Sequence, residues 1–155
     1  IPFDAQKQLG HALALNVDLS KALASDDLPA AKEVASQIKQ VITQVDIDSV
    51  SLETFKDLRS DLNTMVGLLN NFSKHSDIEM ARASFESIGL NAVAFAAKYP
   101  YHTSMGKLAV FHCPMAFNDR GANWIQFSGE QVENPYFGAS MYRCGLEQSL
   151  VPKLK

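Results

Sequence analysis

The sequence predicts an all-α fold, an up-down four-helix bundle with a C-terminal irregular segment and a short helix packed on it. Apolar residues recur at helical spacing through the first two thirds of the chain, and the connections between these stretches are short. From Tyr99 onward the helical period is lost, and Phe, Tyr and the only Trp occur together with Gly and Pro. We expect a single domain over residues 1–155, with the bundle over about 5–98 and the C-terminal segment over about 99–155.

Four amphipathic stretches, about 5–24, 28–45, 51–72 and 77–98, are expected to form the bundle. An acidic N-cap followed by Pro29 predicts the start of the second helix, and Ser76 with Glu79 three residues later predicts a capping box at the start of the fourth. The residues expected to face inward are Leu9, Ala12, Leu13, Val17 and Leu23, then Val34, Ile38, Val41, Ile42 and Val45, then Leu52, Phe55, Leu58, Leu62, Met65, Leu69 and Phe72, and last Ile78, Ala81, Phe85, Ile88, Ala92 and Phe95, with Met80 also assigned to the core.

The C-terminal segment carries signals for shorter elements. The apolar run 108–111 is expected to be extended, and residues 118–121 (Asn-Asp-Arg-Gly) predict a turn. Asn134 and Pro135 resemble an N-cap and a first helical residue, and Gly145 suits a position after a helix. We therefore expect a helix of about two turns over residues 136–144.

Composition limits the classes of function. The 155 residues are 46% hydrophobic and 20% charged, which is typical of a globular chain that folds without a metal or a disulfide. The net charge of −3 argues against a nucleic-acid partner, because no basic field is present to replace the counterions of nucleic acid. No apolar run approaches the roughly 20 residues of a membrane span. Because the sequence starts at Ile1 without a signal-like segment, we expect a mature chain from which a signal or lipoprotein segment has been removed, with a lipid anchor upstream of Ile1 as one form of it.

Sulfur-bearing residues cluster in the C-terminal segment. On an extended segment Cys113 and Met115 would share a face, and on a helix Met141 and Cys144 would do the same. Two thiolates and two thioethers form a soft donor set that selects Cu(I), with Ag(I) as a chemical mimic. His112 could add an imidazole, although on a strand it should point to the opposite face from Cys113. His102 and Met105 form a weaker second pair of candidates.

Other functions fit the same residues. In an exported protein, Cys113 and Cys144 could instead form a disulfide that pins the C-terminal segment, in which case no metal would be bound. The chain would then be a structural or interaction module that docks a partner or a sugar chain through an exposed aromatic patch around Trp124, Tyr136 and Phe137. We expect no enzymatic activity, because neighbouring His112 and Cys113 do not by themselves make a nucleophile–base pair. The Glu-x-x-His pairs of di-iron bundles and the Cys-x-x-Cys-His attachment of covalent haem are absent from the sequence.

One long motif resembles a known family. Residues 113–124 (Cys-Pro-Met-Ala-Phe-Asn-Asp-Arg-Gly-Ala-Asn-Trp), 134–138 (Asn-Pro-Tyr-Phe-Gly) and 141–145 (Met-x-x-Cys-Gly) are similar to the signature of the bacterial domain of unknown function 3347, and the helical part around residues 26–35 also resembles that family. The resemblance implies an exported protein, periplasmic or otherwise in the cell envelope, that handles copper or a related metal. It also implies, as a partner, a periplasmic adaptor subunit of a metal efflux pump.

The signature assigns roles to particular positions. Cys113, Met115, Met141 and Cys144 match its sulfur positions and are the ligand candidates, whereas His112 lies outside it. The positions that we interpret as scaffold are Trp124, Asn134, Pro135, Tyr136, Phe137 and Gly138. The expected function is binding of Cu(I) or Ag(I) between the C-terminal loop and its short helix, as a copper-handling accessory to efflux or resistance.

Overall fold

Four long helices precede a small sheet in the computed structural model, which describes residues 1–51, 53 and 55–151. The helices are α1 (Phe3–Ala24), α2 (Leu28–Thr43), α3 (Leu58–Ser73) and α4 (Ile78–Lys98). The strands are β1 (Leu108–Cys113), β2 (Ala122–Phe127) and β3 (Leu146–Leu150), with the single-turn helix α5 (Ala116–Asp119) between β1 and β2 and the 3₁₀ helix η1 (Gly138–Met141) before β3. None of the helices in these described ranges is long and apolar enough to cross a membrane.

The C-terminal third is a three-stranded antiparallel sheet, so the all-α prediction is wrong and the fold is mixed α/β. The strand order is β2-β1-β3, with Phe111 opposite Trp124 on one side of β1 and His112 opposite Leu146 on the other. The extended segment expected at 108–111 is the middle strand of this sheet. The helix expected over 136–144 is only the 3₁₀ turn Gly138–Met141.

The helical half follows the hydrophobic periodicity closely, with one exception. The bounds of α1, α2 and α4 fall within two residues of the expected ones, but α3 begins at Leu58 instead of residue 51 because turns occupy the preceding segment. Leu52, expected on the inward face of that helix, lies outside the described residues. Met80 is 57% exposed, so its assignment to the core is also wrong.

Acidic side chains cap the starts of α2 and α4. Asp27 accepts a hydrogen bond from the backbone N–H of Ala30 at 3.0 Å, as the sequence predicts. At α4 the cap is Asp77 instead of Ser76, because the Asp77 carboxylate accepts from the N–H of Glu79 at 3.2 Å. The expected capping box therefore does not form, and the Glu79 carboxylate instead accepts a hydrogen bond from Arg82.

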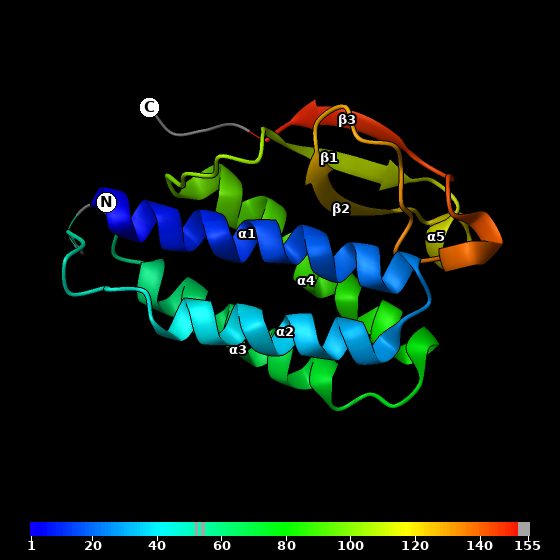
Figure 1. Ribbon diagram of the computed structural model, residues 1–155, viewed down its shortest axis with the longest axis horizontal. Helices are drawn as coiled ribbons and strands as arrows, with labels where there is room; N and C mark the ends of the chain where they lie inside the picture. Colours follow the sequence, from blue (N-terminus) through cyan, green and yellow to red (C-terminus); the bar gives the residue numbers. More distant parts are fainter. Residues whose placement is uncertain (52, 54, 152–155) are drawn as a thin grey trace.

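The sheet lies over α1 and α4, and α2 and α3 cover the far side of this pair (Figure 1). One continuous cluster of buried apolar side chains runs through both parts. Within it, Trp124 is fully buried, with its ring centroid 5.9 Å from that of Phe111 and 6.0 Å from that of Tyr136. Tyr136 in turn lies 5.8 Å from Phe85 of α4, so the aromatic side chains connect the sheet to the helices.

Candidate sulfur site

Cys113 and Cys144 meet although 31 residues separate them. Cys113 ends β1 and is fully buried, and Cys144 lies half-buried just before β3, with 3.6 Å between the two Sγ atoms. The two sulfurs approach because β3 pairs with β1 in a register that places Leu146 opposite His112. Gly145 permits this approach, since a Cβ there would lie 2.8 Å from the carbonyl oxygen of His112. At this separation the two sulfurs are not bonded to each other.

Asn134 fixes the backbone on which Cys144 sits. Its side-chain amide donates to the carbonyl of Cys144 at 2.7 Å, and its Oδ1 accepts from the N–H groups of Tyr136 and Phe137 at 2.8 and 3.1 Å. The expected capping role of Asn134 is therefore confirmed, over a turn instead of a helix. Next to this turn, Cys144 donates its N–H to the carbonyl of Met141 at 3.0 Å.

The surroundings favour the neutral form of the Cys144 thiol. Partial burial raises the pKa of Cys144, and the hydrogen bond with the Cys113 thiol and the charge repulsion between the two groups raise it further. A metal ion that binds here must therefore displace the proton of the Cys144 thiol, which holds it more firmly than an exposed cysteine does.

Met115 and Met141 line a cavity whose described walls do not include the two thiols. The cavity has a volume of about 590 Å³ and lies between α4, α5 and η1. Met115 lies in the turn after β1, with φ −95° and ψ −9°, so it does not continue the face of the strand as the expected spacing requires. The structure thus gives a thiol pair and a thioether pair in neighbouring segments.

A left-handed turn forms one wall of the same cavity. Phe117, Asn118 and Asp119 have φ values of 53°, 56° and 66°, a conformation that costs L-residues roughly 1–2 kcal/mol each. The ring of Phe117 packs edge-on against Tyr136 at 5.4 Å, and the guanidinium of Arg120 lies 5.0 Å above it. Three consecutive strained residues beside a cavity are typical of a functional site.

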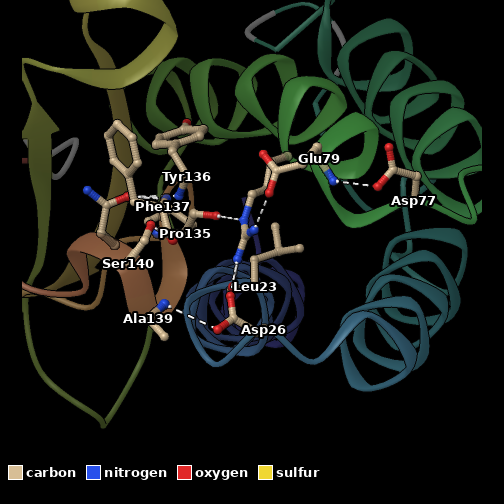
Figure 2. A network of polar contacts seen from close by, with 11 residues as sticks. Leu23, Asp26, Asp77, Glu79, Pro135, Tyr136, Phe137, Ala139 and Ser140 are labelled. Carbon is tan, nitrogen blue, oxygen red and sulfur yellow. Dashed lines mark hydrogen bonds and ion pairs between the residues drawn. The ribbon is translucent and has the colours of Figure 1, made fainter.

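Arg82 forms another part of the cavity wall, and sequence reasoning missed it. Its side chain is 5% exposed and donates to the carboxylates of Asp26 and Glu79 and to two backbone carbonyls, as Figure 2 shows. The guanidinium joins α4, the end of α1 and the segment before η1. Its position between Ala81 and Phe85, on the apolar side of α4, is the sequence signal that could have identified it as a buried cation.

The remaining candidates occupy other environments. His112 Nδ1 lies 2.6 Å from Asn123 Oδ1, and its ring packs against Gly121, so its side chain is engaged away from the sulfurs. Trp124 and Tyr136 are 0% and 6% exposed, so the expected aromatic docking patch is not at the surface. Within the described ranges, no three His, Cys, Asp or Glu side chains form a group that could hold a metal ion.

Comparison with known proteins gives one family. The family model described as "Protein of unknown function (DUF3347)" matches residues 16–102, which is more than half of the chain. The match covers the last nine residues of α1 and all of α2, α3 and α4, and it ends before β1, so the motif from Cys113 to Gly145 lies outside it. No curated protein and no solved structure matched the chain.

Proposed function

The chain belongs to the DUF3347 family, and from this premise we propose that it binds a soft metal ion, Cu(I) or Ag(I), through the thiolates of Cys113 and Cys144. The observation that carries the proposal is the 3.6 Å separation of the two Sγ atoms. Taking the zinc–thiolate length of about 2.3 Å as a guide, two metal–sulfur bonds span at most about 4.6 Å, so one ion can reach both sulfurs without movement of the backbone.

The donor chemistry determines which ion fits. Thiolates and thioethers are soft ligands that select Cu(I) over hard cations such as Mg²⁺ or Ca²⁺. Two thiolates neutralise a monovalent cation and leave a net negative charge. The thioethers of Met115 and Met141 are neutral, and in the adjacent cavity they offer weaker soft donors through which the ion enters or leaves.

The same proposal includes location and partners. We place the protein in the periplasm or cell envelope, as a binding protein without enzymatic activity that passes copper to the periplasmic adaptor subunit of a metal efflux pump. This part rests on what the motif from Cys113 to Cys144 implies by its resemblance to the family signature, and the motif lies outside the matched residues 16–102. Thioethers that solvent can reach, such as those of Met115 (46% exposed) and the half-buried Met141, suit transfer between proteins better than a closed site does.

A competition titration tests the thiol site. Reduced protein is titrated anaerobically with Cu(I) against a chromogenic Cu(I) chelator, and we expect one ion per chain bound tightly by the wild type. The variant Cys113→Ser/Cys144→Ser should lose this tight binding. Unchanged affinity in the double variant would overturn the thiol site.

A second titration tests the methionines. Met115→Leu/Met141→Leu keeps the apolar volume but removes both thioethers. We expect this variant to bind Cu(I) as tightly as the wild type but to release it to the chelator more slowly. Met80→Leu is the control, because Met80 is an exposed methionine on α4 that does not line the cavity. Equal release rates in all three proteins would remove the methionines from the proposal.

The alternative function, a structural module held by a Cys113–Cys144 disulfide, is favoured by the same proximity. Forming the bond requires the sulfurs to approach by about 1.5 Å, to the disulfide length of about 2.05 Å. Intact mass after denaturing alkylation, on protein recovered from an oxidising compartment, separates the two functions. Two alkylated thiols support metal binding, whereas the absence of alkylation supports the disulfide unless reduction restores Cu(I) binding.

A further inference from the structure

A second group of metal-binding side chains lies at the opposite end of the molecule from α5. His11 of α1 and His102 and Met105 of the segment between α4 and β1 line one cavity of about 290 Å³. Figure 1 shows the N-terminal half of α1 and this connecting segment at one end of the fold, with α5 at the other end. The sequence separates His11 from His102 by 91 positions, so only the fold brings them together.

The backbone around His102 is held firmly against α1. The N–H of His102 donates to the carbonyl of Gln6 at 2.9 Å. Gly10 makes this contact sterically feasible, because a Cβ at that position would lie 1.7 Å from the carbonyl oxygen of His102. Since Gly10 directly precedes His11, this contact holds the His102 segment beside the part of α1 that carries His11, and both histidines line the cavity.

The two side chains from the connecting segment are exposed but ordered by neighbours. The ring of Phe3 packs on the imidazole of His102 with 4.9 Å between centroids. The N–H of Met105 donates to Thr103 Oγ1 at 3.2 Å, which fixes the turn that carries the thioether. Met105 is 64% exposed, so it contributes little to the core, and His11 and His102 are exposed as well.

Lys7 is the one lysine or arginine among the described residues that line this cavity. Its ammonium pairs with Asp4 at 2.8 Å and lies 5.1 Å from the ring of Phe3. The carboxylate of Asp4 thus offsets the charge of Lys7 beside the imidazole and thioether groups of the cavity.

We propose that His11, His102 and Met105 form a second, thiol-free site for Cu(I), with Ag(I) as its mimic. Imidazole suits copper, and the thioether shifts the preference toward the monovalent ion. Because no cysteine takes part, this site keeps its donors when Cys113 and Cys144 are oxidised. An exposed site of this kind acquires the ion from solution under conditions in which the thiol pair cannot.

Nuclear magnetic resonance of the methionine methyl groups tests the second site directly. The chain has five methionines, and Ag(I) is added to protein labelled at each methyl carbon. We expect the Met105 methyl signal to shift as the site fills, while that of Met80, which is exposed and far from these donors in sequence, stays in place. A Met105 signal that shifts no more than that of Met80 would overturn the second site.

Substitutions then separate this site from the thiol site. His11→Ala/His102→Ala should weaken Ag(I) binding at Met105 at least about tenfold, and His75→Ala serves as the histidine control. The double variant Cys113→Ser/Cys144→Ser should leave the Met105 response unchanged. An imidazole–thioether site independent of the thiols would be contradicted if the Met105 response were lost in the cysteine variant or persisted without both histidines. Neither outcome decides whether the thiol site exists, which the chelator titration tests separately.

Discussion

Replacing the buried cation Arg82 should destabilise the fold at the point where helices and sheet segment meet. In Arg82→Met the apolar stem remains and only the guanidinium is lost. The guanidinium donates to the carbonyls of Leu23 and Pro135 at 2.7 and 2.9 Å. It also bonds the carboxylates of Asp26 at 2.6 Å and Glu79 at 2.8 Å.

The expected loss follows from what each acceptor does afterwards. An unsatisfied buried carbonyl costs about 1–3 kcal/mol, and the adjoining cavity admits water, so the lower end applies to both carbonyls. The side chains of Asp26 and Glu79 are 45% and 71% exposed, so they regain water and their ion pairs are worth less than about 1 kcal/mol together. The sum is about 2–3 kcal/mol, or a melting temperature lower by about 4–12 °C for a domain of this size.

Calorimetry and urea unfolding of both proteins measure this difference. The control is Lys98→Met, which removes an ammonium that is 47% exposed and paired with Asp57 and Asp61, and which should cost less than about 1 kcal/mol. The hydrogen bond from Arg82 also holds the pKa of Asp26 below its usual range. A folded-state pKa below the unfolded value stabilises the protein at pH above the unfolded pKa, and this contribution disappears as pH falls through the folded pKa. In Arg82→Met the hydrogen bond is gone, so a carboxyl titration should find Asp26 with an ordinary pKa. If Arg82→Met unfolds at the same temperature as Lys98→Met, the reasoning is refuted.

Three further predictions concern the same region. Gly138→Ala should lower the unfolding free energy more than Gly129→Ala does. Both positions have positive φ, but only a Cβ at residue 138 would meet Asp26 Oδ1, at 2.0 Å. Equal unfolding free energies of the two variants would contradict this. Oxidation to a Cys113–Cys144 disulfide closes a loop between residues 31 positions apart and should stabilise the chain by about 3–4 kcal/mol. Calorimetry should then show a melting temperature that falls when reductant is added, and Cys113→Ser should abolish this sensitivity to reductant. The thiols must lose protons to bind metal, so Cu(I) affinity should increase with pH. Because the pKa of Cys144 is raised, the increase should continue above the pKa of an ordinary thiol. A flat pH profile in the chelator titration would exclude the thiolates as ligands.

Hydrophobic periodicity predicted the helices because each buries a single stripe. It failed where burial has another pattern. In β2 nearly every residue from Ala122 to Phe127 is buried, so no alternation marks the strand, and in β3 all five residues from Leu146 to Leu150 are exposed. Strand pairing also depends on partners that are distant in the chain, which local spacing does not encode.

The candidate site was predictable in its residues but not in its grouping. The sequence identified Cys113 and Cys144, and the fold brings their sulfurs together. It could not show that the turn after β1 would carry Met115 into a cavity with Met141, since this depends on the left-handed backbone at 117–119. Arg82 was missed because three of its acceptors, on Leu23, Asp26 and Pro135, lie more than 50 positions away.

The family match covers helices that hold no candidate thiol, yet these helices position both sulfurs. A Cβ at Gly89 of α4 would lie 2.9 Å from the carbonyl oxygen of Asn123, so this glycine lets β2 lie directly on the helix. The same carbonyl accepts a hydrogen bond from the Tyr136 hydroxyl at 2.6 Å. Tyr136 follows Asn134, whose amide holds the carbonyl of Cys144. Through these contacts the helical platform fixes the segment of Cys144 against the sheet that contains Cys113, so a substitution in α4 should alter the spacing of the two thiols without touching either of them.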